Sequence, residues 1–320
     1  MFVEDRFIQC ATYAGPDELP VLVWVLPSAF LAHGRALNAL LAKYPLLVDE
    51  YLIRYDFERD CPPRYRVGEH TDEWGCVWHT AKDGFEGYVR GHPIPTRDAI
   101  WLYQEPRSLS GLLPHGFMYL RLLDLRGFEE AMIDFAEEPE ELPVLLEKVT
   151  RANIRHIEAL CRERPDKMLI LGDDLGMQNG LAIGAEKWRK WLKPCFKRIY
   201  DVCRAHGRYV FMHTDGQVYE IMPDLQETGV HILNPQFRAN GLDNLVRVCK
   251  GKIPICLDLD RQMFPFASPA ELKAHAEEAV SALWLKEGGL ALHLELGPDV
   301  PLENMEALLS AVDALRHYTA

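Results

Sequence analysis

The chain has 320 residues, of which 48 are acidic and 35 basic, so its formal net charge at pH 7 is −13. A field of this sign repels the phosphate backbone, which excludes nucleic acid as an expected partner. The length suits one large domain or two small ones, and an α/β barrel alone often takes about 250 residues or more.

The apolar segments predict no membrane span and no secretion. The longest apolar stretch, 19–32, is interrupted by Pro20, Pro27 and Ser28, and it is shorter than the roughly 20 residues that cross a bilayer. The start, MFVEDRFIQC, is mixed and acidic, which argues against a signal peptide, so we expect a cytoplasmic protein. The eight cysteines contain no C-x-x-C pair. Buried reduced thiols are therefore expected, and not a disulfide framework or a structural zinc site.

The first half of the chain has an uneven pattern. The run VLVWVL at 21–26 is continuously apolar and β-branched, which predicts a strand buried on both faces. A helix is expected at 29–41. Residues 49–90 are rich in aromatic, charged, glycine and proline residues and predict loops with a short hairpin around 74–88. The other elements expected in this half are a strand at 116–122 and helices at 128–137 and 140–161.

From residue 168 onward, short apolar runs alternate regularly with helical periodicity. Five such units, with the strands of the first half, predict a parallel sheet closed as a single (β/α)8 TIM barrel over residues 1–320, an α/β fold. A doubly wound open sheet is the alternative, but no glycine-rich nucleotide loop follows the first strand. The expected strands are 168–172, 209–213, 230–234, 254–258 and 290–296, and the expected helices are 185–206, 217–228, 241–250, 268–287 and 301–316.

Polar side chains stand at the carboxyl ends of these strands, the edge where parallel α/β folds bind ligands. Alternation along a strand puts His213 and Asp215 on one face, and His293 and Glu295 on one face. Such groups can bind a divalent metal, form a proton-transfer network, or satisfy one another as a buried polar cluster. The full set of strand-end candidates is Asp173, Asp174, His213, Asp215, Asn234, Gln236, Asp258, Asp260, His293 and Glu295.

Four motifs stand out in the second half of the chain: LGDDLGMQNGLAI at 171–183, YVFMHTDG at 209–216, ILNPQ at 232–236 and GPDVPLENMEAL at 297–308. Together they resemble motifs of the uroporphyrinogen decarboxylase superfamily. DEWGCVW at 72–78 and GHPI at 91–94 resemble the branch that includes corrinoid-dependent methyltransferases. The resemblance covers most of the chain from about residue 62 and implies an (α/β)8 barrel with its pocket at the C-terminal mouth. Members of this superfamily decarboxylate acetate side chains of a tetrapyrrole, or move methyl groups to or from a corrinoid.

The chain departs from both groups within this superfamily. The decarboxylases carry an arginine-rich motif near the N-terminus that grips substrate carboxylates, whereas VLVWVLPSAFLAHGRAL contains only Arg35. This disfavours a polyanionic tetrapyrrole. The zinc methyltransferases use a His-x-Cys motif and a later Cys, whereas here His213 is followed by Thr214 and Asp215. An oxygen-rich set suits thiol activation poorly, which argues against a thiol as methyl acceptor.

From the resemblance we expect a methyltransferase that moves a methyl group from a small donor, such as a methoxylated aromatic, to the corrinoid (cobalamin) of a partner protein. A uroporphyrinogen decarboxylase-like carboxy-lyase and a non-catalytic ligand-binding barrel are the alternatives, and a homodimer is one expected assembly. The expected catalytic residues are His213, Asp215, Asp174 and Glu295. The expected zinc ligands are His213, Asp215 and Glu295, with His293 as a substitute. The expected substrate-binding residues are Gln178, Asn234, Gln236, Trp74, Trp78 and His293.

Overall fold

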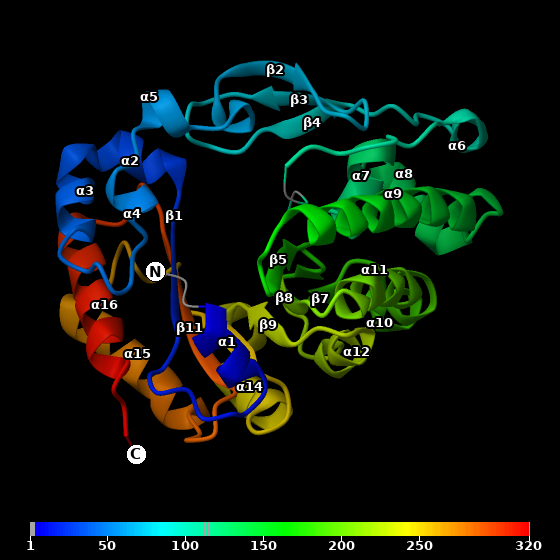
Figure 1. Ribbon diagram of the computed structural model, residues 1–320. Coiled ribbons are helices and arrows are strands. Elements are labelled where there is room, and N and C mark those ends of the chain that lie inside the picture. The colour runs from blue at the N-terminus through cyan, green and yellow to red at the C-terminus, as the bar shows by residue number, and fades with distance from the viewer. Residues whose placement is uncertain (1–3, 112, 114, 320) are drawn as a thin grey trace. The chain divides into compact units, whose positions relative to one another are not determined.

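The computed structural model describes residues 4–111, 113 and 115–319 (Figure 1). Residues 1–3, the start of the segment MFVEDRFIQC discussed above, lie outside the described residues. The chain groups into two compact units, the first of 1–68, 80–87 and 234–320 and the second of 69–79 and 88–233. A single domain over 1–320 therefore stays a prediction.

Six strands form one sheet in the order β1-β11-β10-β9-β8-β5. The pairs β1–β11, β10–β11 and β5–β8 are parallel. The predicted α/β class with a parallel, barrel-type sheet is confirmed, and the described residues give this sheet six strands. Every strand expected after residue 168 is present, as β5 (Met168–Gly172), β8 (Tyr209–Thr214), β9 (Ile232–Pro235), β10 (Ile255–Asp258) and β11 (Leu290–Leu296).

The first unit contains β1 (Val21–Val25), β10 and β11, with helices packed beside them. The helices α15 and α16 lie side by side (orange and red in Figure 1). Ser268 and Glu271 form a reciprocal capping box at the start of α15, which fixes where this helix begins. The helices of the unit are α1 (Glu4–Ala11), α2 (Pro27–His33), α3 (Arg35–Leu41), α4 (Glu50–Ile53), α5 (Phe57–Asp60), the 3-10 helix η1 (Pro63–Tyr65), α13 (Phe237–Asn240), α14 (Leu242–Cys249), α15 (Pro269–Leu283) and α16 (Leu302–Leu315).

The second unit contains β5 and β8, and α9 packs beside α11 within it (Figure 1). The helix α9 buries Leu142, Leu145, Leu146 and Val149, an i, i+3, i+4, i+7 stripe typical of an amphipathic helix. The helix expected at 185–206 is interrupted by a π-helical turn. The helices are α6 (Arg97–Leu102), α7 (Tyr119–Arg126), α8 (Phe128–Glu137), α9 (Glu141–Glu163), α10 (Gly184–Lys187), the π-helix η2 (Trp188–Leu192), α11 (Lys193–Ala205) and α12 (Met222–Thr228).

The described residues also form two small sheets. The first has the order β2-β3-β4, from Gly68–Thr71, Val77–Thr80 and Tyr88–Gly91, and its antiparallel β3–β4 pair confirms the hairpin expected around 74–88. The second is the short antiparallel pair β6 (Gly176–Met177) and β7 (Gly180–Leu181), directly after β5. Across the described part of the chain, no helix has the length and apolarity that a membrane span requires.

The strand predicted at 116–122 is wrong, because this segment enters helix α7 at Tyr119. Its aromatic and β-prone residues suggested a strand, but the local pattern does not show what begins the helix. The carboxylate of Asp173 accepts the backbone N–H groups of Met118 at 3.0 Å, Tyr119 at 2.5 Å and Leu120 at 2.9 Å. A side chain far along the sequence therefore caps the first turn of α7.

Candidate functional site

The candidate site begins where β5 and β8 end together. These strands pair in register, with Gly172 opposite His213, and the backbone N–H of Asp173 donates to the carbonyl of His213 at 3.0 Å. The next residues of both strands therefore leave the sheet at the same edge. The sequence analysis predicted this edge for polar side chains, and the structure confirms it for Asp174 and Asp215.

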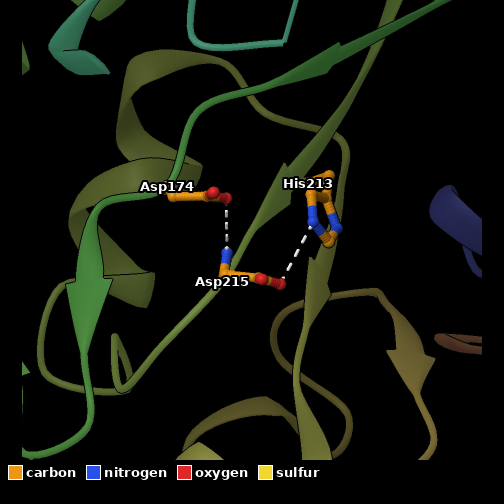
Figure 2. Close-up of side chains that lie close together, drawn as sticks. All are labelled: Asp174, His213 and Asp215. Atoms are coloured by element: carbon orange, nitrogen blue, oxygen red, sulfur yellow. Dashed lines mark hydrogen bonds and ion pairs between the residues drawn. The ribbon is translucent and has the colours of Figure 1, made fainter. Parts of the chain in front are cut away.

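Asp174, His213 and Asp215 form a compact cluster, which Figure 2 shows. One ligand atom of each lies within 4.8 Å of the others. Nε2 of His213 lies 3.3 Å from Oδ1 of Asp215, as the alternation along β8 predicts. The imidazole is almost buried, whereas the two carboxylates are partly exposed. The cluster can therefore meet a small ligand on its carboxylate side.

Backbone contacts hold the loops that carry this cluster. The N–H of Asp215 donates to Oδ1 of Asp174 at 3.1 Å, and Oγ1 of Thr214 accepts the N–H of Leu175 at 3.1 Å. Gly176 and Gly216 touch, since a Cβ on Gly216 would stand 2.2 Å from the carbonyl carbon of Gly176. This approach of two backbones requires glycine, and it joins the β5 and β8 loops rigidly.

The imidazole of His115 contacts this cluster from outside it, although the sequence analysis did not identify it. Its Nε2 lies 3.0 Å from Oδ2 of Asp174, and its ring centroid is 5.5 Å from that of His213. His115 lies in a loop outside every periodic segment, so no spacing signal marks it. Its position depends on the contacts of the following helix, α7, with the end of β5.

Burial and charge shift the proton equilibria of these groups in opposite directions. Burial acts to raise the pKa of Asp174, but the hydrogen bond and charge of His115 outweigh it and hold this pKa below its usual value. Burial acts to lower the pKa of His115, and its contact with Asp174 more than offsets this, so the pKa is raised. The contact therefore favours the charged form of both groups.

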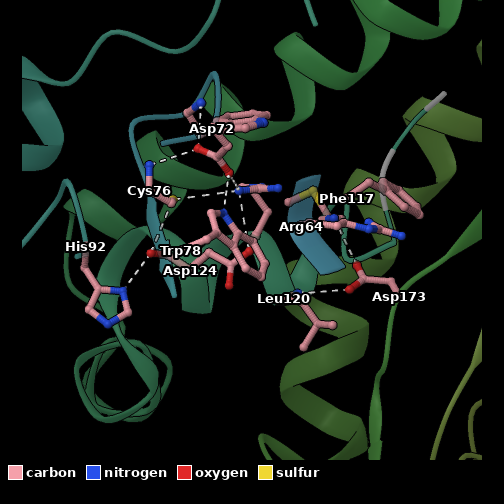
Figure 3. Close-up of polar contacts among 12 residues, drawn as sticks. Arg64, Asp72, Cys76, Trp78, His92, Phe117, Leu120, Asp124 and Asp173 are labelled. Atoms are coloured by element: carbon pink, nitrogen blue, oxygen red, sulfur yellow. Dashed lines mark hydrogen bonds and ion pairs between the residues drawn. The ribbon is translucent and has the colours of Figure 1, made fainter. Parts of the chain in front are cut away.

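Asp173 has a different environment from its neighbour Asp174. Complete burial raises the pKa of Asp173 to about 7, against the opposing effect of the amides of Leu120 and Tyr119. Figure 3 shows the Asp173 carboxylate directed at Leu120. All three of its hydrogen bonds described above come from amides at the start of α7. We therefore assign Asp173 a structural role, as the cap of this helix, and not a role in binding substrate.

The donor set of the cluster fits a divalent metal ion. Imidazole and carboxylate groups bind zinc and similar borderline ions, and oxygen ligands shift the preference toward harder ions. The eight cysteines are free thiols, and none belongs to the cluster, so these residues provide no thiolate. Asp174, His213 and Asp215 would hold the ion, and two of these, His213 and Asp215, are among the expected metal ligands, whose role stays a prediction.

Gln178 and the two tryptophans lie in different surroundings from the cluster. Gln178 is exposed at the turn between β6 and β7. Trp74 is buried, with the guanidinium of Arg121 over its ring at 5.2 Å. Nε1 of Trp78 donates to Oδ2 of Asp72 at 3.0 Å, as Figure 3 shows. The substrate roles expected of these three residues stay predictions.

A second polar cluster lies on β10 and β11 in the first unit. Asp258 and His293 are paired residues of these strands, and Oδ1 of Asp258 lies 3.3 Å from Nδ1 of His293. Both side chains are almost inaccessible to solvent. The ring of Trp24 meets that of His293 edge-on, with the centroids 4.4 Å apart. His293 is therefore enclosed by protein groups, which disfavours its direct contact with a substrate.

Glu295 forms an ion pair with Nη1 of Arg261, whose Nε lies 3.7 Å from Oδ2 of Asp258. An ion placed on Glu295 would have to compete with this guanidinium. Asn234 donates from Nδ2 to the carbonyl of Cys256 at 2.6 Å. The carbonyl of Gln236 accepts Nδ2 of Asn240 at 2.8 Å. The roles predicted for Glu295, His293, Asn234 and Gln236 stay predictions, as does the convergence of Glu295 with the first cluster.

The chain is similar to several solved structures at low sequence identity. A B12-independent methionine synthase from Shewanella sp. W3-18-1, in complex with selenomethionine, shares 13% identity over 88% of this chain and 85% of its own, with a TM-score of 0.40. The IOLI protein with a binding zinc atom shares 16% identity over 70% of this chain and 82% of its own, with a TM-score of 0.33.

A dihydropteroate synthase from Xanthomonas albilineans, with 4-aminobenzoic acid, shares 15% identity over 49% of this chain, with a TM-score of 0.31. The chain spans 54% of that synthase. No curated protein matches the chain. The family model described as Uroporphyrinogen decarboxylase (URO-D) matches residues 122–315, which is more than half of the sequence and contains the Asp174, His213 and Asp215 cluster. The chain therefore belongs to the uroporphyrinogen decarboxylase (URO-D) family.

Proposed function

We propose that this chain is a methyltransferase that takes a methyl group from the oxygen of a small methoxylated compound and transfers it to the Co(I) corrinoid of a separate protein. The observation that supports this most is the cluster of Asp174, His213 and Asp215 at the ends of β5 and β8. It offers a metal site or an acid in a family that includes both decarboxylases and methyltransferases.

The chemistry requires help for the leaving oxygen. The C–O bond of the donor breaks, its electron pair stays on oxygen, and the methyl carbon forms a bond with the electron pair of Co(I). The alkoxide or phenoxide that leaves must be protonated or bound to a cation as the bond breaks. The contact of 3.3 Å between Nε2 of His213 and Oδ1 of Asp215 supports a role for His213 in donating this proton or in binding such a cation.

A bound divalent ion would supply Lewis-acid stabilisation of that oxygen. The chain's own contribution is to hold the ligands: the N–H of Asp215 orients Asp174, and the touching glycines fix both loops. Gln178, at the exposed β6–β7 turn of the same unit, is proposed to orient the rest of the donor. The alternative reaction, decarboxylation, would need several cations for a polycarboxylate, and the cluster instead offers two carboxylates.

The test is the change in the visible spectrum of cobalt when Co(I) becomes methyl-Co(III). Free cob(I)alamin and a corrinoid protein are mixed with the chain and with methoxylated aromatics, one donor at a time. We expect methylation that requires the chain and the Co(I) state together. If no ether, amine or thioether donor gives methylation, and CO₂ is released from a tetrapyrrole acetate, the decarboxylase function replaces this proposal.

His213→Ala is the decisive variant. We expect turnover to fall by about 10²–10⁴-fold, with a smaller change in donor binding, because help to the leaving oxygen is greatest in the transition state. His206→Ala is the matched control, since His206 is an exposed histidine at the end of α11 in the same unit. Equal losses of turnover in His213→Ala and His206→Ala would show that His213 does not assist the leaving oxygen.

A further inference from the structure

His115 is held in place at the end of β5 by the segment that follows it. The N–H of Gly116 donates to the carbonyl of Gly172 at 2.8 Å, and Nδ2 of Asn153 donates to the carbonyl of Phe117 at 2.8 Å. The three amides bound by Asp173 come directly afterwards. The backbone beside His115 is thus fixed to the same strand that carries Asp174.

The absence of a side chain at Gly172 makes room for the imidazole. A Cβ at this position would stand 2.4 Å from Nδ1 of His115 and 3.5 Å from Cβ of His213. Any larger residue at the last position of β5 would therefore displace His115. In the space that results, Nε2 of His115 lies 3.0 Å from Oδ2 of Asp174.

We propose that His115 is the fourth protein ligand of a divalent metal site whose other ligands are Asp174, His213 and Asp215. This inference rests on the proposed function in the case where the cluster binds a metal ion. Glu295, which the sequence analysis expected as a ligand, is not part of this ligand set. Two imidazoles and two carboxylates form a mixed nitrogen and oxygen set, which suits zinc, cobalt or another borderline first-row ion better than calcium or magnesium. The oxygen of a donor would take a further position as the coordination expands.

The position of the fourth ligand has a chemical consequence. Asp174 faces His115 through Oδ2 and receives the N–H of Asp215 through Oδ1. Asp174 and His115 would then hold the ion together, in place of their direct contact. The segment from His115 to the start of α7 would then belong to the metal site, so the site would include residues that precede β5 in the chain.

X-ray absorption of the Zn²⁺- or Co²⁺-loaded full chain tests this inference by counting imidazole ligands. We expect two imidazoles in the wild type and one each in His115→Ala and His213→Ala. Metal affinity should fall by about 10–100-fold in His115→Ala, and His206→Ala should match the wild type. One imidazole in the wild type, or no stoichiometric metal, would overturn the inference.

Gly172→Ala is a second variant that removes no ligand atom. Its added Cβ should displace His115, so we expect one imidazole in its spectrum and a loss of affinity like that of His115→Ala. A folded Gly172→Ala protein with two imidazoles and wild-type affinity would contradict the inference. The proposed function is tested separately: two imidazoles without any cobalt methylation reject methyl transfer alone, and methylation with one imidazole rejects the fourth ligand alone.

Discussion

The backbone N–H of Asp215 donates to Oδ1 of Asp174, while the side chain of Asp215 faces Nε2 of His213 (Figure 2). One residue therefore orients a carboxylate with its main chain and an imidazole with its side chain. These two roles can be separated, because a substitution of the Asp215 side chain leaves the hydrogen bond to Asp174 intact.

Asp215→Asn uses this separation. The amide keeps the shape of the side chain but loses the charge that attracts an ion or an imidazolium, so we expect metal affinity to fall by about 10–100-fold. The far-ultraviolet circular dichroism and the urea midpoint should stay close to those of the wild type. Calorimetric titration with Zn²⁺ measures the affinity, and an unchanged value would remove Asp215 from the ligand set.

The contact between Gly176 and Gly216 predicts a sharp difference between two alanine variants. Gly216 has φ +82° and a Cβ there would stand 2.2 Å from the carbonyl carbon of Gly176, whereas Gly207 has φ +69° and no neighbouring atom within 4 Å. Both variants carry the strain of a left-handed alanine, and only Gly216→Ala adds the clash. We expect Gly216→Ala to lose about 1–3 kcal/mol more of the free energy of unfolding than Gly207→Ala. Equal losses in urea denaturation would show that the two loops move apart easily.

Asp173 should matter for stability far more than an ordinary surface carboxylate. In Asp173→Ala three amides at the start of α7 lose their acceptor, and we expect a loss on the order of 3 kcal/mol in the free energy of unfolding. Asp173→Asn keeps an acceptor oxygen and should lose less. Chemical denaturation measures the free energy of unfolding of the two variants. A larger loss in Asp173→Asn than in Asp173→Ala would contradict the role of Asp173 as the cap of α7.

His275 predicts how stability depends on pH. Its Nε2 accepts the backbone N–H of Asp260 at 3.0 Å, and burial holds its pKa below the usual value. The unfolded chain therefore binds this proton more readily, so the contribution of His275 is present above about pH 6.5 and is lost as the pH falls below it. In His275→Gln the loss of stability between pH 7.5 and 5.5 should become smaller. Urea unfolding midpoints at pH 7.5 and pH 5.5 measure this loss. If the loss in His275→Gln equals that of the wild type, His275 does not contribute to the pH dependence of stability.

Trp78 offers a test of a predicted substrate contact. Its Nε1 donates to Asp72 (Figure 3). Oδ2 of Asp72 also accepts a hydrogen bond from Nη1 of Arg121 at 2.7 Å. Trp78→Phe removes one hydrogen bond of this cluster, and we expect a loss of about 1 kcal/mol in the free energy of unfolding. Donor binding, measured by titration, should change by less than about threefold, an amount below 1 kcal/mol. A much larger change would support the expected role of Trp78 in the pocket.

The sequence predicted the elements after residue 168 well because each depends on its own periodicity. β8 is buried nearly throughout, and its run of apolar residues shows this without any tertiary information. The alternation along this strand likewise predicts that His213 and Asp215 are neighbours, and their contact at 3.3 Å confirms it. Local patterns of this kind determine which side chains one strand presents on one face.

The features that the sequence did not predict all depend on residues distant in the chain. Helix α7 resembled a strand because its cap is Asp173, which stands 55 positions after Met118. His115 gave no signal because it joins the cluster through a loop and through the space at Gly172. The ion pair between Glu295 and Arg261 gave no signal, because Arg261 is 34 positions away and follows another strand.

The long-range cap of α7 also affects when this helix can fold while the chain is being synthesised. Synthesis proceeds from the N-terminus, so Tyr119 and Leu120 leave the ribosome more than fifty residues before Asp173, the acceptor of their amides. The first turn of α7 can take its native form only after β5 has emerged, and closing a loop of this length slows the step. A nascent chain that stops before residue 173 therefore lacks this helix start and keeps its apolar side chains available to chaperones.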